Sequence, residues 1–127
     1  MESPPCIAVV DDEAPVRKAL GRLLRLADYA VVGFASGEEF LASLVTRRPD
    51  CVLLDIQLPG LSGLQVHKQL LDAGARVPVV FITAGDRAAL AQEAPDLCGA
   101  SVLHKPFSGE AMLRAVGAVI AGTAGRT

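Results

Sequence analysis

The sequence predicts a doubly wound α/β domain built on a five-stranded parallel sheet. Short apolar runs alternate with helical patterns along the whole chain, as expected for successive βαβ units with right-handed crossovers. One run, Cys51 to Leu54, is continuously apolar, which is typical of a strand buried on both faces. Several runs end in acidic or polar residues, and open α/β sheets bind their ligands at the carboxyl ends of the strands.

The first strand is predicted at Cys6–Val10 and is followed by a helix over Ala14–Ala27. Leucine and valine recur at helical spacing in this helix, and Pro15 suits its first turn. Ala30–Phe34 has the length and the β-branched composition of a second, short strand. These three segments make up the first βαβ unit.

A second helix is expected from Ser36 to about Val45, because Ser36 has the character of an N-cap and Glu39 follows three residues later, as in a capping box. The central strand is predicted at Val52–Leu54. It runs into a turn marked by Pro59 and the glycine after it.

The third helix is predicted over residues 63–73, with Ser62 as its N-cap and Gly74 as its stop signal. Val77–Ile82 forms the fourth strand, and Pro78 is tolerated because it stands at the start of that strand.

The last part of the chain contains one weak helical pattern and one clear one. An alanine-rich segment, Asp86–Ala94, is predicted as a helix although it has only one leucine. Ala100–Leu103 forms the fifth strand. Ser108 caps a final helix that extends to about Ala121.

Composition indicates one globular domain that has a substantial core. Of the 127 residues 51% are hydrophobic and 20% are charged, so disorder is excluded. We assign residues 1–5 to an N-terminal tail, residues 6–121 to the domain, and residues 122–127 to a tail or the start of a linker. The net charge of −2 argues against a nucleic-acid surface, and no apolar run reaches membrane-spanning length. Three cysteines without metal-ligand spacing indicate a reduced, cytoplasmic protein.

Chemical groups gather at the ends of four predicted strands. Asp11 and Asp12 follow the first strand, Asp55 follows the third, Thr83 ends the fourth, and Lys105 lies just after the fifth. An aspartate after a strand is also a common turn former. Carboxylates brought together, however, suit a hard cation such as Mg²⁺, and a carboxylate can act as a nucleophile toward phosphorus.

Four motifs in order give the chain its family resemblance. They are the acidic pair Asp11-Asp12, the D-x-x-L-P-G pattern that begins at Asp55, the T-A pair at Thr83, and the K-P-F pattern that begins at Lys105. Together they resemble the receiver domain of two-component response regulators. The runs VVDDE, APVRKAL and ASGEEFL are most similar to the FixJ/NarL-like branch. The resemblance implies a flavodoxin-like (βα)5 fold with strand order 2-1-3-4-5.

The resemblance implies roles for the acidic residues and the lysine. Asp55 would be the phosphoacceptor. Asp12 and Asp55 would ligate Mg²⁺ directly, Asp11 would act partly through water, and Gln57 would contribute its backbone carbonyl. Lys105 would pair with Asp55 before phosphorylation and with a phosphoryl oxygen afterwards.

Further residues would stabilise the phosphoryl group and transmit the change. Thr83 would donate its hydroxyl to the phosphoryl group, and the small Ala84 would leave the site open to a phosphodonor. The resemblance also implies a cis peptide bond between Lys105 and Pro106. Receivers usually carry an aromatic residue three positions before the lysine, but this chain has Val102. We therefore expect switching to depend less on a rotating ring.

The expected function is phosphorylation-dependent signalling, with self-phosphorylation and self-dephosphorylation but no enzyme activity on other substrates. The phosphodonor would be a sensor histidine kinase. The face made by the fourth helix, fifth strand and fifth helix would switch, could mediate a homodimer, and would control a DNA-binding output domain outside this chain. A stand-alone receiver acting by protein binding or phosphorelay is an alternative. A Mg²⁺-dependent aspartyl-phosphate phosphatase is disfavoured, because Gln57 stands where such enzymes carry an acid.

Overall fold

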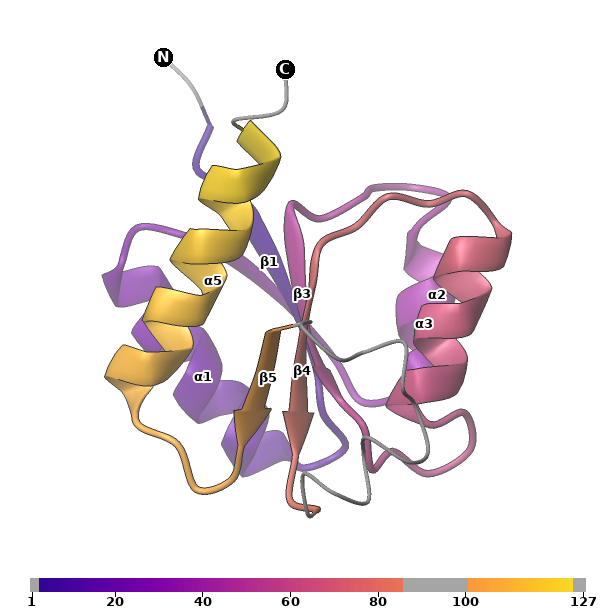
Figure 1. Cartoon of the computed structure of the whole chain (residues 1–127), viewed down its shortest axis with the longest axis horizontal. Helices are drawn as coiled ribbons and strands as arrows, with labels where there is room; N and C mark the ends of the chain where they lie inside the picture. The colour runs from indigo at the N-terminus through magenta and orange to yellow at the C-terminus, as the bar shows by residue number, and fades with distance from the viewer. Residues whose placement is uncertain (1–2, 86–100, 125–127) are drawn as a thin grey trace.

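The computed structural model describes residues 3–85 and 101–124 (Figure 1). One parallel sheet has the order β2-β1-β3-β4-β5, which confirms the predicted topology. The strands are β1 (Cys6–Val10), β2 (Ala30–Phe34), β3 (Cys51–Asp55), β4 (Val79–Thr83) and β5 (Ser101–His104). The helices are α1 (Ala14–Leu26), α2 (Gly37–Ser43), α3 (Gly63–Asp72) and α5 (Gly109–Ala124). The predicted helix at Asp86–Ala94 lies outside the described residues.

Alternation along the strands divides the core into two halves. Ile7 and Val9 of β1 belong to a cluster with α1 and α5, whereas Ala8 and Val10 belong to a cluster with α2 and α3. Figure 1 shows these two helix pairs on opposite sides of the sheet. Successive side chains of a strand point to opposite faces, so a strand covered on both sides must be apolar throughout. This accounts for the unbroken apolar runs in the sequence.

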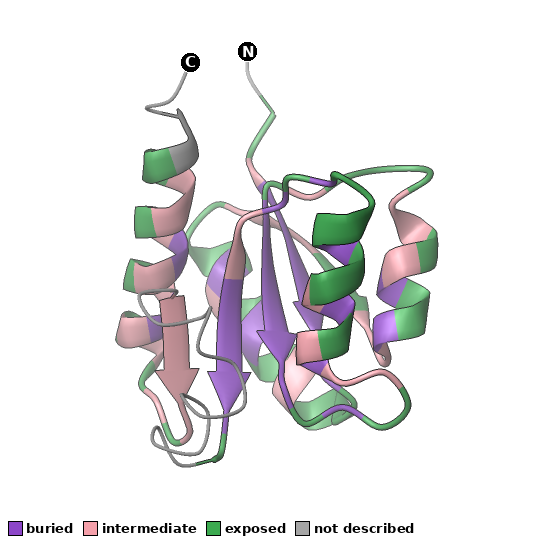
Figure 2. Ribbon diagram, turned by 45° about the vertical axis from the view of Figure 1, so that its right-hand side comes forward, coloured by how far each residue is buried: buried purple, intermediate pink, exposed green. Residues whose placement is uncertain are grey.

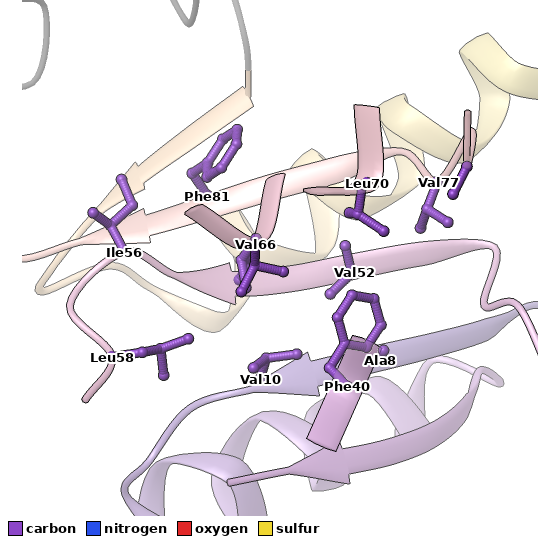
Figure 3. Packing of buried hydrophobic residues seen from close by; sticks show 12 residues of the cluster. Ala8, Val10, Phe40, Val52, Ile56, Leu58, Val66, Leu70, Val77 and Phe81 are labelled. Atoms are coloured by element: carbon purple, nitrogen blue, oxygen red, sulfur yellow. The ribbon is translucent and has the colours of Figure 1, made fainter. Parts of the chain in front are cut away.

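Aromatic and aliphatic side chains fill the half of the core under α2 and α3 (Figure 3). Phe40 of α2 is fully buried, and its ring meets that of Phe34 edge-to-face with centroids 5.6 Å apart. The two helices approach closely at Gly37, where an added Cβ would collide with a methyl group of Val66. The start of α2 therefore depends on a residue without a side chain.

The centre of the sheet is more deeply buried than its edges (Figure 2). Every residue of β1 and β3 is buried, whereas each residue of β5 is only partly buried and β2 is partly exposed. The inner strands thus form the buried centre of the scaffold, where Asp55 ends β3 and Asp11 directly follows β1.

Helix starts follow the capping residues that the sequence indicates. The Ser36 hydroxyl accepts a hydrogen bond from Glu39 N at 3.1 Å. The Glu39 carboxylate accepts from Ala35 N instead of Ser36 N, so the predicted capping box is only half formed. Ser62 and Gln65 form a full capping box at α3. At α5 the Ser108 hydroxyl accepts from Ala111 N at 3.0 Å.

Several boundaries differ from those predicted. Helix α2 ends at Ser43 rather than near Val45, because the Ser43 hydroxyl bonds to the Phe40 carbonyl and Val45 is 92% exposed, with no packing to extend the helix. Helix α1 ends at Leu26, one residue early. Strand β4 begins at Val79, since Pro78 has no N–H for the ladder.

Extensions occur at three other elements. Strand β3 gains one residue at each end and β5 runs from Ser101 to His104, while α5 continues to Ala124. Within the described parts of the chain, no helix combines the length and the apolar character needed to cross a membrane.

Candidate functional site

The predicted site residues come together at the carboxyl edge of the sheet. Asp55 is the last residue of β3, Asp11 directly follows β1, and Thr83 ends β4. All three are at most 2% exposed. Lys105 follows β5, and its backbone N–H donates to the Thr83 carbonyl at 2.8 Å. Parallel pairing therefore places residues that are far apart in the sequence around one small volume.

Three carboxylates form an acidic cluster here. One oxygen from each of Asp11, Asp12 and Asp55 lies within 4.8 Å of the others. Asp11 is fully buried, and its Oδ1 accepts from Glu13 N at 2.9 Å. No described residue donates a hydrogen bond to its Oδ2. A buried carboxylate oxygen without a donor is costly unless a cation balances it, so the donor set fits a hard divalent metal ion.

Lys105 supplies positive charge to the cluster. Its Nζ lies 3.6 Å from Oδ2 of Asp55 and 3.7 Å from Oδ2 of Asp11. These separations exceed hydrogen-bond length, so the lysine acts as a charge shared between two carboxylates. The peptide bond from Lys105 to Pro106 is cis, which confirms that prediction.

The environment of Asp55 raises its pKa to about 6 in the metal-free protein. Burial is the largest cause, because it penalises the charged form, and the negative charge of Asp11 acts in the same direction. The backbone N–H of Gln57, which donates to Oδ1 at 2.9 Å, and the charge of Lys105 both oppose this rise.

Close packing fixes the loop that follows Asp55. Gly63 opens α3 directly against the end of β3, and its N–H donates to the Ile56 carbonyl at 3.0 Å. A Cβ at this position would lie 2.8 Å from Cα of Ile56 and would collide with the Asp55 carbonyl oxygen. Gly60 has a φ of 71°, a left-handed conformation that glycine adopts readily. The sequence marks this turn but not the backbone contact at Gly63.

The structure also shows a role for Gln57 that the sequence does not reveal. Its side-chain amide crosses to the end of β4, where Nε2 donates to Thr83 Oγ1 at 3.2 Å and Oε1 accepts from Ala84 N at 3.1 Å. The Gly85 backbone N–H donates to the same threonine oxygen at 2.9 Å. No short-range pattern could indicate these contacts, because the bonded residues are 26 and 27 positions apart.

A second unpredicted contact stabilises the loop after β1. The Arg17 guanidinium donates from Nη1 to the Asp11 carbonyl at 2.7 Å. Its side chain passes over β2 at Gly33, where an added Cβ would lie 3.5 Å from Cδ of the arginine. The basic spacing of α1 is visible in the sequence, but the target of Arg17 is not.

Val102 is partly buried and pairs in register with Phe81 of β4. Phe81 is 1% exposed and meets the His67 ring edge-on at 5.1 Å. An aromatic ring thus lies on the neighbouring strand, beneath α3, and it is packed in the core rather than at the surface. Pro106 and Ala84 are exposed.

Comparison with known proteins agrees with this geometry. A sequence profile of the response regulator receiver domain matches residues 7–117. The chain is 37% identical over 110 residues to transcriptional regulatory protein FixJ of Azorhizobium caulinodans, covering 87% of this chain and 52% of that protein. It is 34% identical to transcriptional regulatory protein TdiR of Thauera aromatica, covering 91% and 51%. The chain therefore spans about half the length of these relatives.

Solved structures give the same result. The crystal structure of a response regulator receiver protein from Burkholderia phymatum superposes with a TM-score of 0.78 at 45% identity, covering 92% of this chain and 95% of that one. The likeness thus extends over nearly the whole of both chains.

Proposed function

Because this chain belongs to the response regulator receiver domain family, we propose that Asp55 accepts a phosphoryl group from a sensor histidine kinase. The observation that supports this assignment is the placement of one buried carboxylate between an acidic cluster and Lys105. Receiver domains are signalling phosphoacceptors of two-component systems rather than enzymes. This chain would form an aspartyl phosphate on itself and later lose it.

The contacts of Asp55 indicate how its carboxylate would react. The Gln57 N–H holds Oδ1, which leaves Oδ2, the oxygen facing Lys105, as the nucleophile. Oδ2 attacks phosphorus, the bond from phosphorus to the imidazole nitrogen of the donor breaks, and that nitrogen keeps the electron pair. Lys105 then lies beside the new phosphoryl oxygens and balances their charge. Since its pKa is about 6, Asp55 is ionised and nucleophilic at neutral pH.

The acidic cluster would hold Mg²⁺ through carboxylate oxygens of Asp11, Asp12 and Asp55, and the carbonyl of Gln57 would complete the protein ligands. When bound, Mg²⁺ neutralises charge on the carboxylates and on the transferring group. The buried Oδ2 of Asp11, which receives no hydrogen bond from a described residue, supports this assignment. Arg17 and Glu13 hold the loop that presents Asp11.

Thr83, Ala84, Lys105 and Pro106 border the position of the phosphoryl group and would transmit its arrival. The response would spread to the face formed by β5, α5 and the predicted helix between β4 and β5, and this face could mediate a homodimer. Position 102 carries a valine, so the proposed mechanism involves no rotation of an aromatic ring there.

The remainder of the full-length protein would carry a DNA-binding output, so that phosphorylation regulates transcription in the cytoplasm. This rests on the relatives, which are described as transcriptional regulatory proteins about twice the length of the chain. The receiver would not contact nucleic acid itself, in keeping with its net charge of −2. The buried free thiols of Cys6 and Cys51 suit a reducing compartment.

Intact-protein mass spectrometry after incubation with acetyl phosphate and Mg²⁺ tests the proposal. We expect one phosphate adduct in the wild type and none without Mg²⁺ or in Asp55→Asn. An adduct that persists in Asp55→Asn would show that another residue is the acceptor. Repeated turnover of small phosphate esters would instead indicate a phosphatase.

A further inference from the structure

The Gln57 side chain joins the two loops that flank Asp55. Its backbone N–H binds the Asp55 carboxylate, and its amide group binds Thr83 and Ala84 at the end of β4. One residue therefore contacts both the proposed phosphoacceptor and the segment that would respond to it.

The amide of Gln57 binds groups that border the proposed position of the phosphoryl group. The Ala84 N–H points at Oε1 of Gln57, so a neutral carbonyl takes the place of an anionic oxygen at this donor. Thr83 Oγ1 accepts from both Gln57 Nε2 and Gly85 N, which fixes the position of its hydroxyl. Thr83 is 2% exposed, so few alternative partners from water are open to it.

Gly85 gives separate support to the same arrangement. A Cβ on Gly85 would lie 3.3 Å from Thr83 Oγ1 and 3.5 Å from Gln57 Nε2. The backbone thus approaches both members of the contact, and a Cβ at this position would press on the Thr83 hydroxyl while only touching the Gln57 amide. Thr83 is the buried member of this arrangement, whereas Gln57, Ala84 and Gly85 are exposed.

We propose that the Gln57 amide is a latch that holds Thr83 and Ala84 until the phosphoryl group on Asp55 displaces it. The inference rests on the function proposed above and makes Gln57 a positioning residue, which acts through Thr83 and Ala84. Hydrogen bonds to an ionised acceptor are roughly twice as strong as those between neutral groups, so a phosphoryl oxygen takes the Ala84 N–H from Oε1.

Displacement also changes the anchor of the latch. Before phosphorylation, the Gln57 N–H binds a carboxylate oxygen of Asp55. A phosphorylated carboxyl group is a weaker acceptor, because the negative charge then lies on the phosphate. The loop after β4 is thereby released from the loop after β3. This gives a route from the phosphoryl group to the loop after β4 that needs no aromatic ring at position 102.

Beryllium fluoride with Mg²⁺, which forms a phosphoryl-like adduct on a carboxylate, provides the test. Forming the adduct must break the latch in the wild type but not in Gln57→Ala, so we expect the variant to bind beryllium fluoride about three- to tenfold more tightly. Gln65→Ala removes another glutamine amide, one that caps α3, and is the matched control with unchanged affinity. Equal or weaker binding by Gln57→Ala would overturn the latch.

A second readout follows the glutamine itself. In the wild-type NMR spectrum, the side-chain NH₂ signals of Gln57 should move on saturation with beryllium fluoride to the position typical of the exposed Gln69. A Gln57 amide that kept its bonds to Thr83 and Ala84 would not take the position typical of an exposed glutamine, and that result would refute displacement. If the wild type did not bind beryllium fluoride, or Asp55→Asn bound it equally well, both the latch and the proposed phosphoacceptor would be wrong. Normal wild-type binding with no effect of Gln57→Ala would contradict the latch alone.

Discussion

Replacing Asp55 by asparagine should stabilise the metal-free protein at neutral pH, even though it removes the central residue of the site. The side chain is 3% exposed, and its carboxyl group is harder to ionise in the folded state than in the unfolded chain. Asparagine keeps an oxygen that can accept the Gln57 N–H but carries no charge. The variant therefore removes a buried charge while preserving the shape of the site.

The size of the effect follows from the pKa of Asp55, which rises from 3.8 to about 6 on folding. At 1.36 kcal/mol for each pKa unit, ionising this carboxylate costs up to about 3 kcal/mol of folding free energy. This pKa already includes the attraction to Lys105, so we expect Asp55→Asn to gain up to about 3 kcal/mol at pH 8.

The pH dependence has a definite sign. Because the folded state binds the Asp55 proton more tightly, this group lowers the free energy of unfolding as the pH rises from about 3.8 to about 6. The advantage of Asp55→Asn should be absent below pH 3.8, grow through this window and stay constant above it. Contributions from titrating groups far from Asp55 cancel in the difference between the two proteins.

Urea unfolding in EDTA, followed by circular dichroism at pH 4 to 8, measures this difference. Wild-type protein should regain stability with Mg²⁺, by about 1.4 kcal/mol at ten times the dissociation constant, and Asp55→Asn should regain less. A variant less stable than the wild type at pH 8, or a difference independent of pH, would refute the assigned burial and charge of Asp55.

Three further substitutions test other parts of the structure. Lys105→Ala should slow phosphorylation from acetyl phosphate by roughly ten- to a hundredfold in mass-resolved time courses, because it removes the positive charge 3.6 Å from Oδ2 of Asp55; an unchanged rate would contradict this role. Gly63→Ala should lower the free energy of unfolding by about 1–3 kcal/mol, since its Cβ would collide with the backbone of Ile56. An unchanged midpoint of chemical denaturation would show that the backbone shifts to accommodate the methyl group. Phe40→Ala should cost about 3–5 kcal/mol in the same assay while leaving the site chemistry intact in any folded fraction, because the ring is fully buried on the side of the sheet under α2.

Sequence patterns predicted the parts of the fold that depend on burial and on local hydrogen bonds. The run from Cys51 to Leu54 lies in the central strand because no position in it tolerates a polar side chain on either face. Ser36 and Ser62 cap helices because the partner of each hydroxyl is three residues away. Parallel pairing then brings the strand ends together, so the positions of Asp11, Asp55 and Thr83 follow from the topology.

Long-range side-chain contacts and the ends of exposed elements could not be predicted in this way. Gln57 was expected to act through its backbone carbonyl, but its amide reaches Thr83, and only the folded chain determines that distance. The end of α2 near Val45 depends on the lack of packing at an exposed residue. Asp86–Ala94 lies outside the described residues, so its predicted helix stays a prediction.

The distribution of burial indicates where this receiver can change shape. Strands β1 and β3 are buried throughout and carry Asp11 and Asp55 at their ends, so the acidic side of the site stands on the least deformable part of the sheet. Strand β5 is only partly buried, and its Val102 lies beside Phe81, which is itself packed in the core. Conformational changes draw on the less stable parts of a fold, so they belong at the end of β4 and beyond rather than around the carboxylates. Gln57 is the described side chain whose amide crosses between these two regions, and breaking its hydrogen bonds costs little compared with deforming the core.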